Sequence, residues 1–154
     1  MPWVQVVPVV DFRVRRLCFT PYPGHQKGCP NYKKCARCPP KAPLIHHEID
    51  LSREVWAVYN AFDIASHIEK MRAKHPDWSE RQLVNCLYWQ PGARKQLKAE
   101  LVKFAKEHRG LVLAATPEAM GVDLTATMAA VGIQLEWPPR KLAYQIVLAG
   151  FAQR

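Results

Sequence analysis

Runs of apolar residues in separate parts of the chain have the β-branched and aromatic content that is typical of strands. They cover residues 3–10, 54–62 and 142–151, and a shorter run covers 111–115. Pro8 predicts that the first strand lies at a sheet edge or ends early. The run at 54–62 also fits a helix, but its β-branched and aromatic residues favour a strand. We expect the run at 142–151 to be a central strand.

Helical signals fill the segments between these runs. Asp63 is a good N-cap for a helix ending near Lys74, and Ser79 with Gln82 forms a capping box for a helix over 80–89. A longer helix is predicted over 93–108 and a short one over 124–131. Strands near the start, middle and end with helices between them predict one α/β or α+β domain over 1–154, with two layers and a small mixed sheet.

Composition agrees with a folded domain. Apolar residues make up 49% of the chain, which is enough for a hydrophobic core and argues against disorder. No apolar run is long enough to cross a membrane, so we expect no membrane partner. The sequence does not predict an oligomeric state.

The segment 18–40, CFTPYPGHQKGCPNYKKCARCPP, contains four of the five cysteines. Its prolines and glycines exclude a regular helix or a central strand, and it has few apolar residues to pack. Metal bonds would give such a loop a reason to be ordered, and four thiolates complete a tetrahedral or iron–sulfur site. We therefore predict one metal centre whose ligands are Cys18, Cys29, Cys35 and Cys38.

The identity of the metal stays open between two candidates. The spacing Cys-x10-Cys-x5-Cys-x2-Cys has a single Cys-x2-Cys pair, whereas structural zinc usually has two, and this favours a [4Fe-4S] cluster over Zn²⁺. His25 is an alternative ligand. Two disulfides would also use four cysteines, but the sequence shows no signal peptide, so we expect reduced thiols and a cytoplasmic location. Cys86 falls among apolar positions and is expected to be a core thiol.

Charge in the same region is one-sided. Residues 12–41 include eight lysines and arginines and no acidic residue, in a chain of formal net charge +9. Four thiolates around Zn²⁺ or a [4Fe-4S]²⁺ core have a net negative charge, which leaves the loop at about +6. An anion-facing surface follows, with DNA or RNA as the expected partner, and Phe19, Tyr22 and Tyr32 are candidates for base stacking. The alternative is that the cations only offset the thiolates. The residues predicted to contact nucleic acid are Arg13, Arg15, Arg16, Lys27, Lys33, Lys34 and Arg37.

Several segments resemble a known family when they are taken in order. The matching pieces are Arg13-Val14 with Cys18, then 28–32 (GCPNY), then 38–40 (CPP), and later 118–123 (EAMGVD) with Thr125 and Gly132. They resemble the predicted metal-binding proteins designated domain of unknown function 2284. The resemblance implies metal binding, with Cys35 completing a set of four ligands. That family usually has a second cysteine cluster before the C-terminal block, and 110–116 contains no cysteine, so this chain resembles a single-centre relative.

Two functions of different classes follow from these observations. In the first, a non-catalytic metal centre holds a basic loop that binds nucleic acid or a nucleoprotein partner. In the second, an iron–sulfur enzyme performs redox or sulfur-transfer chemistry, with Cys35 not ligated and His25, His46 or Glu48 acting as acid or base. No Ser-His-Asp arrangement, phosphate-binding glycine loop or dinucleotide fingerprint is present, and we favour the binding function.

Overall fold

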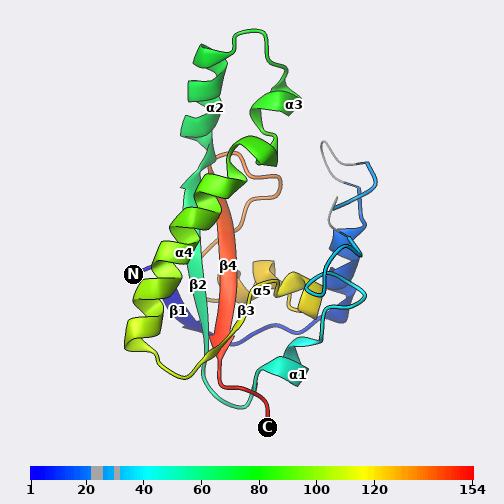
Figure 1. The fold of residues 1–154 in the computed structure, drawn as a ribbon, viewed down its shortest axis with the longest axis vertical. Helices are drawn as coiled ribbons and strands as arrows, with labels where there is room; N and C mark the ends of the chain where they lie inside the picture. Colours follow the sequence, from blue (N-terminus) through cyan, green and yellow to red (C-terminus); the bar gives the residue numbers. More distant parts are fainter. Residues whose placement is uncertain (22–25, 30–31) are drawn as a thin grey trace.

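The fold is built around a four-stranded sheet in the order β1–β2–β4–β3 (Figure 1). The structure is a computed structural model, and it describes residues 1–21, 26–29 and 32–154. The strands are β1 (Trp3–Val6), β2 (Val55–Asp63), β3 (Val112–Ala114) and β4 (Leu142–Gly150). All four coincide with the predicted strand segments, and β1 lies at an edge and ends before Pro8, as predicted.

Pairing between β2 and β4 is the longest in the sheet. It runs over nine residues of each strand, from Val55 opposite Gly150 to Asp63 opposite Leu142. Every strand pair is antiparallel, so the prediction of a mixed sheet is wrong. The reason is the place of β4: it lies between β2 and β3, which run in the same direction but do not touch. The prediction of a small domain of the α/β or α+β type is confirmed.

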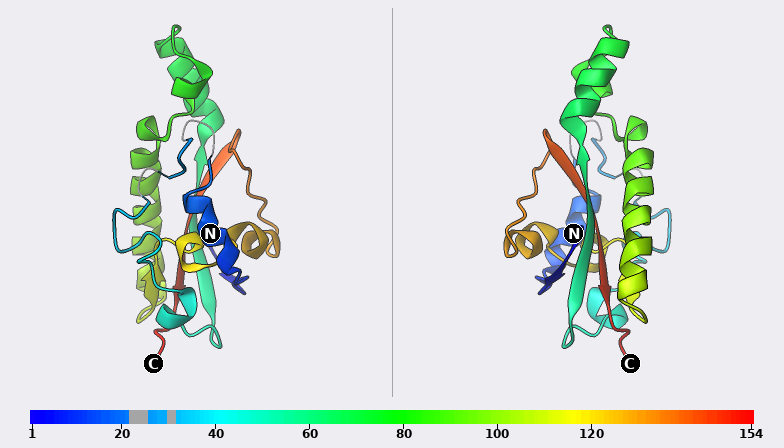
Figure 2. Two further views of the ribbon diagram at one scale, coloured as in Figure 1. Left: turned by 90° about the vertical axis from the view of Figure 1, so that its right-hand side faces the viewer. Right: turned by 90° about the vertical axis from the view of Figure 1, so that its left-hand side faces the viewer.

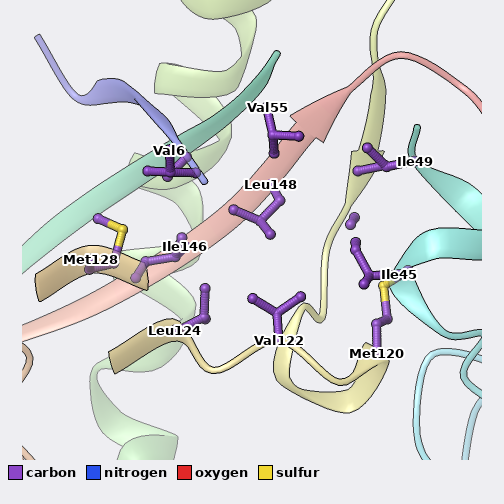
Figure 3. Packing of buried hydrophobic residues seen from close by; sticks show 12 residues of the cluster. Val6, Ile45, Ile49, Val55, Met120, Val122, Leu124, Met128, Ile146 and Leu148 are labelled. Carbon is purple, nitrogen blue, oxygen red and sulfur yellow. The ribbon is translucent and has the colours of Figure 1, made fainter. Parts of the chain in front are cut away.

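Alternating side chains of β2 and β4 divide the core between the two faces of the sheet. Ile146 and Leu148 of β4 lie on one face, where residues following β3 pack on them (Figure 3). On the other face, Val58 and Ala149 contact Phe104 of the long helix α4 (Gln90–Glu107). Figure 2 shows α4 on one side of the sheet and α5 (Leu124–Ala129) on the other. The central strands are therefore covered on both faces, which is why their sequences are apolar at consecutive positions.

The helices follow their capping signals closely. Asp63 Oδ1 accepts the Ser66 N–H (3.0 Å) at the start of α2 (Ile64–Lys74), and the Ser79–Gln82 capping box opens α3 (Glu80–Leu83). Together α2 and α3 form an arm that extends past one end of the sheet (Figure 1). The predicted helix over 80–89 is wrong in length, because the Asn85 side chain accepts the Leu87 N–H and starts a separate 3₁₀ turn, η2 (Cys86–Tyr88).

Two further differences from the sequence concern boundaries. Helix α4 begins at Gln90 and not at residue 93, because Pro91 is accepted in a first turn, where its missing N–H breaks no bond. A short helix, α1 (Ile45–Glu48), lies between the cysteine-rich segment and β2, outside the helices that we predicted. Cys86 is half-buried against an apolar cluster with Trp89, in keeping with a core thiol. Among the described residues, no helix has both the length and the apolar character that crossing a bilayer requires.

Candidate metal centre

The cysteine loop starts at the end of the 3₁₀ helix η1 (Phe12–Cys18) and closes on itself at once. The Cys18 carbonyl accepts the Cys29 N–H at 2.8 Å. Gly28 makes this approach possible, since it has a φ of 82° and a Cβ there would lie 2.6 Å from the Phe19 backbone. A side chain would meet both obstacles, so only glycine fits. The backbone thus places Cys18 and Cys29 side by side.

A tight turn brings the other two thiols together. The Cys38 N–H donates to the Cys35 carbonyl at 3.1 Å, and the two Sγ atoms are 3.1 Å apart. The bond with Cys38 lowers the pKa of the exposed Cys35 thiol, and N–H groups of Arg37 and Cys38 donate to its sulfur and lower it further. The same bond with Cys35, followed by burial, raises the pKa of Cys38. Backbone N–H donors stabilise the thiolate, which is the form that binds a metal.

Electrostatic interactions link the two cysteine pairs through Cys29. Burial is the main cause that raises the pKa of the Cys18 thiol, and the charge of Cys29 is the next. The charge of Cys29 also contributes to the raised pKa of Cys38. Cys29 therefore interacts electrostatically with both Cys18 and Cys38.

The four cysteines do not yet form a closed site. Among the residues that the structure describes, no group of three or more His, Cys, Asp or Glu side chains is arranged to hold a metal ion. All five cysteines, each within the described ranges, are free. The pair Cys35–Cys38 is already close, since ligands of one tetrahedral zinc ion stand about 3.8 Å apart for zinc–sulfur bonds of about 2.3 Å. Closing the site requires the Cys18–Cys29 pair to approach them.

Glu118, which sequence reasoning did not single out, lies beside the loop. It begins the 3₁₀ turn η3 (Glu118–Met120), which packs against η1 through Gly121 (φ 92°), where a Cβ would overlap the Phe12 ring. Burial, and then the charge of Asp123, raise the pKa of the Glu118 carboxyl, and its own charge raises the pKa of Cys18. The available signal was its place in the 118–123 block.

Arg15 fastens the far end of the loop. Its guanidinium donates to the carbonyls of Ala42 at 3.1 Å and Pro40 at 3.4 Å, and its Nε atom is buried with no partner in the described structure. Arg15 also opposes the raised pKa of Cys18. A third link joins the loop to the domain, because the Thr116 hydroxyl donates to the Arg37 carbonyl at 2.9 Å. Arg15 is thus a half-buried clamp, although the sequence placed it among the surface cations.

The other predicted cations differ in the contacts that their side chains make. Arg13 is exposed, but it forms an ion pair with Asp11 at 2.9 Å. The remaining predicted cations are exposed. Lys33 Nζ lies 5.4 Å from the centre of the Tyr32 ring. The centres of the Tyr32 and Phe19 rings are also 5.4 Å apart. Tyr22 and His25 fall outside the described residues. Apart from Arg13, the exposed cations are Arg16 of η1 and, within the loop, Lys27, Lys33, Lys34 and Arg37.

The acid–base candidates of the enzyme hypothesis lie on α1. His46 and Glu48 are both exposed, and the His46 ring is 4.2 Å from His47 and 5.8 Å from Phe12. Among the described residues, neither side chain joins the thiols in a group that could hold a metal ion.

Comparisons with protein families, with curated proteins and with solved structures find no match to this chain. Membership of the family that the sequence resembles therefore stays a prediction. Functional conclusions must come from the geometry of the loop itself.

Proposed function

We propose that this protein binds one metal centre through Cys18, Cys29, Cys35 and Cys38, and that the centre holds a basic loop that binds nucleic acid. The observation that carries the proposal is the Cys35–Cys38 pair, whose sulfur atoms are 3.1 Å apart, in a loop where the Cys29 N–H also donates to the Cys18 carbonyl at 2.8 Å. The hydrophobic clusters of the core do not supply the order of this loop: between Val6 and Ala42 the described buried residues are Gly28 and Pro39, and neither belongs to those clusters.

The sulfur separation favours a single ion over a cluster. Two ligands of one tetrahedral ion share that ion and stand close, whereas the cysteines of a cubane bind different irons at separate corners. A distance of 3.1 Å is near the first case. We therefore propose Zn²⁺ as the metal, with the [4Fe-4S] cluster favoured by the spacing as the other outcome of the same measurement. Bound zinc would act as a cross-link that contributes folding free energy to the loop.

Exposed cations support an anionic partner. Four basic side chains of the loop, together with Arg16 of η1, are exposed, and no acidic residue lies between 12 and 41. Lysines and arginines that meet phosphates release counterions, which is the main source of non-specific affinity for nucleic acid. The Phe19–Tyr32 pair lies in the same loop and offers aromatic surface for unpaired bases.

Metal analysis tests the first half of the proposal. Protein purified without oxygen is expected to be colourless and to contain one zinc ion per chain. About four iron and four sulfide per chain, with absorption near 400 nm, would establish a cluster instead. Protein that is folded but takes up neither metal would contradict the proposed centre.

Titration of salt tests the second half. Affinity for mixed-sequence single-stranded and duplex oligonucleotides is expected to fall steeply with salt concentration, with a log–log slope of about −0.7 to −0.9 per phosphate contact. Lys33→Glu with Lys34→Glu should weaken binding and reduce the slope by about one unit for each lysine. The matched control is Lys95→Glu with Lys98→Glu on α4, which makes the same charge change away from the loop. Binding that is absent, indifferent to salt or equally weakened by both pairs would contradict a loop interface.

A further inference from the structure

The Cys35–Cys38 turn has the arrangement of a dithiol that can oxidise. Cys35 is exposed to solvent, its sulfur lies 3.1 Å from that of Cys38, and a backbone bond of 3.1 Å already closes the turn between them. A disulfide needs a sulfur–sulfur distance of about 2.05 Å, so the two atoms have only about 1 Å to travel. No other pair of thiols in the described chain is recorded this close.

We propose that Cys35 and Cys38 close to a disulfide when the protein meets an anionic low-molecular-weight disulfide such as glutathione disulfide, and that closure releases the metal. The proposal rests on the metal centre proposed above and adds its regulation. Loss of two of four thiolate ligands leaves too few donors for a tetrahedral site. The loop then loses the bonds that order it, so oxidation would switch the nucleic-acid surface off.

The reaction balances as two thiol–disulfide exchanges. The Cys35 thiolate attacks one sulfur of the small disulfide, which forms a mixed disulfide and expels the first thiolate. The Cys38 thiolate then attacks the Cys35 sulfur and expels the second thiolate. The protein loses two electrons and the small disulfide gains them; because metal-bound Cys35 and Cys38 carry no protons, the departing thiolates take protons from the solvent.

The surroundings of Cys35 explain why this pair reacts first. Lys33, Lys34 and Arg37 are exposed next to it and attract an anionic reagent. Cys18, by contrast, is half-buried, which restricts its access to a reagent in solution. Cys86 is half-buried in a separate apolar cluster.

Peptide mapping gives a direct test. The metal-loaded protein is treated with glutathione disulfide, its remaining thiols are alkylated, and metal release is followed with a chromogenic chelator. Trypsin cuts after Lys34, Arg37 and Lys41, so a Cys35–Cys38 disulfide leaves peptide 35–37 linked to peptide 38–41. We expect this linked pair to be the first product, to appear with the metal and to separate on reduction.

Variants that change the nearby charges test why this pair reacts first. They leave all four cysteine ligands in place. Lys33→Glu with Lys34→Glu should slow the reaction with glutathione disulfide roughly tenfold at low salt and speed it with cystamine, a cationic disulfide. The α4 control pair, Lys95→Glu with Lys98→Glu, should change neither rate. If the loop variant reacts with each reagent at the same rate as the native protein does, the role of these lysines is overturned.

Two other outcomes separate this proposal from the proposed function. A first disulfide that joins other cysteines, or metal loss while Cys35 and Cys38 stay reduced, would overturn the switch and leave the metal centre intact. Protein that contains no metal before oxidation would contradict the proposed function, and the same peptide map would still decide whether the dithiol closes.

Discussion

At the scale of single residues, Gly28 is the position on which the geometry of the cysteine loop depends most. Its φ of 82° and the 2.6 Å approach to the Phe19 backbone allow the Cys29 N–H to reach the Cys18 carbonyl. Gly28→Ala should therefore separate the Cys18–Cys29 pair and lower metal affinity. The left-handed backbone alone costs an alanine about 1–2 kcal/mol, before the overlap with Phe19 is counted.

Metal content after dialysis against a competing chelator measures this effect. Gly92→Ala is the matched control, because no atom lies within 4 Å of its Cβ position and it sits in the first turns of α4. That variant should retain the metal and keep or slightly raise its thermal stability. Equal metal retention in both variants would show that the loop tolerates a side chain at Gly28.

The residue scale also shows what sequence could and could not provide. The cysteines were predicted as one group because thiol chemistry and spacing are visible in the sequence. Arg15 and Arg16 are neighbours that look alike, yet Arg15 turns inward to two carbonyls while Arg16 stays exposed. Glu118 lies 100 positions after Cys18 and reaches it only because η3 packs on η1. Such placements depend on tertiary packing, which local patterns do not encode.

At the scale of elements, the Asp63 cap joins the end of β2 to the start of α2. Its carboxylate accepts the Ser66 N–H at 3.0 Å and the Ser66 hydroxyl at 2.8 Å, and these bonds lower the pKa of Asp63. Asp63→Ala should lower Tm by roughly 2–4 °C, as expected for loss of a helix cap in a chain of this size. Asp77→Ala, an exposed change in the turn after α2, should alter Tm much less.

The pH dependence of this cap has a definite sign. Since the folded-state pKa of Asp63 lies below its unfolded value, the charged cap stabilises the protein above the ordinary aspartate pKa. That stability is lost as pH falls through the lowered folded-state value. The amide oxygen of Asp63→Asn can still accept the Ser66 N–H without a charge, so the Tm advantage of the native protein over this variant should disappear in acid. An advantage that grows in acid would contradict the assignment.

Elements with a local signal were predicted well, and those decided by pairing were not. Caps at Asp63 and Ser79 and the apolar runs of β2 and β4 are written in neighbouring residues. Insertion of β4 between β2 and β3 is a long-range choice, and it makes the sheet antiparallel throughout. The break at Asn85 is also local. Both the helix before it and the 3₁₀ turn after it are short, so the sequence pattern does not separate them from one continuous helix.

At the scale of the whole molecule, the cysteine loop and the sheet domain depend on different sources of stability. The hydrophobic clusters of the core come from the strands, their covering helices and the segments beside them, and they include no described residue between Val6 and Ala42. The loop is joined to that core by a few polar links, which include the Thr116 hydroxyl bond to Arg37 and the Arg15 bonds to Pro40 and Ala42. Removal of the metal should therefore disorder the loop and leave the sheet and α4 folded.

Limited trypsin digestion of metal-loaded and metal-free protein tests this separation. Metal-free protein should be cut first within 27–41, after exposed sites such as Lys33, Lys34 and Arg37, while its circular dichroism keeps the helical signal of α4. Bound metal should slow these cuts at least tenfold, because a tenfold effect needs only about 1.4 kcal/mol and structural zinc sites supply about 10–16 kcal/mol. If chelation instead unfolds α4 together with the loop, the metal is part of the core's stability, and the loop is not an independent attachment to the sheet.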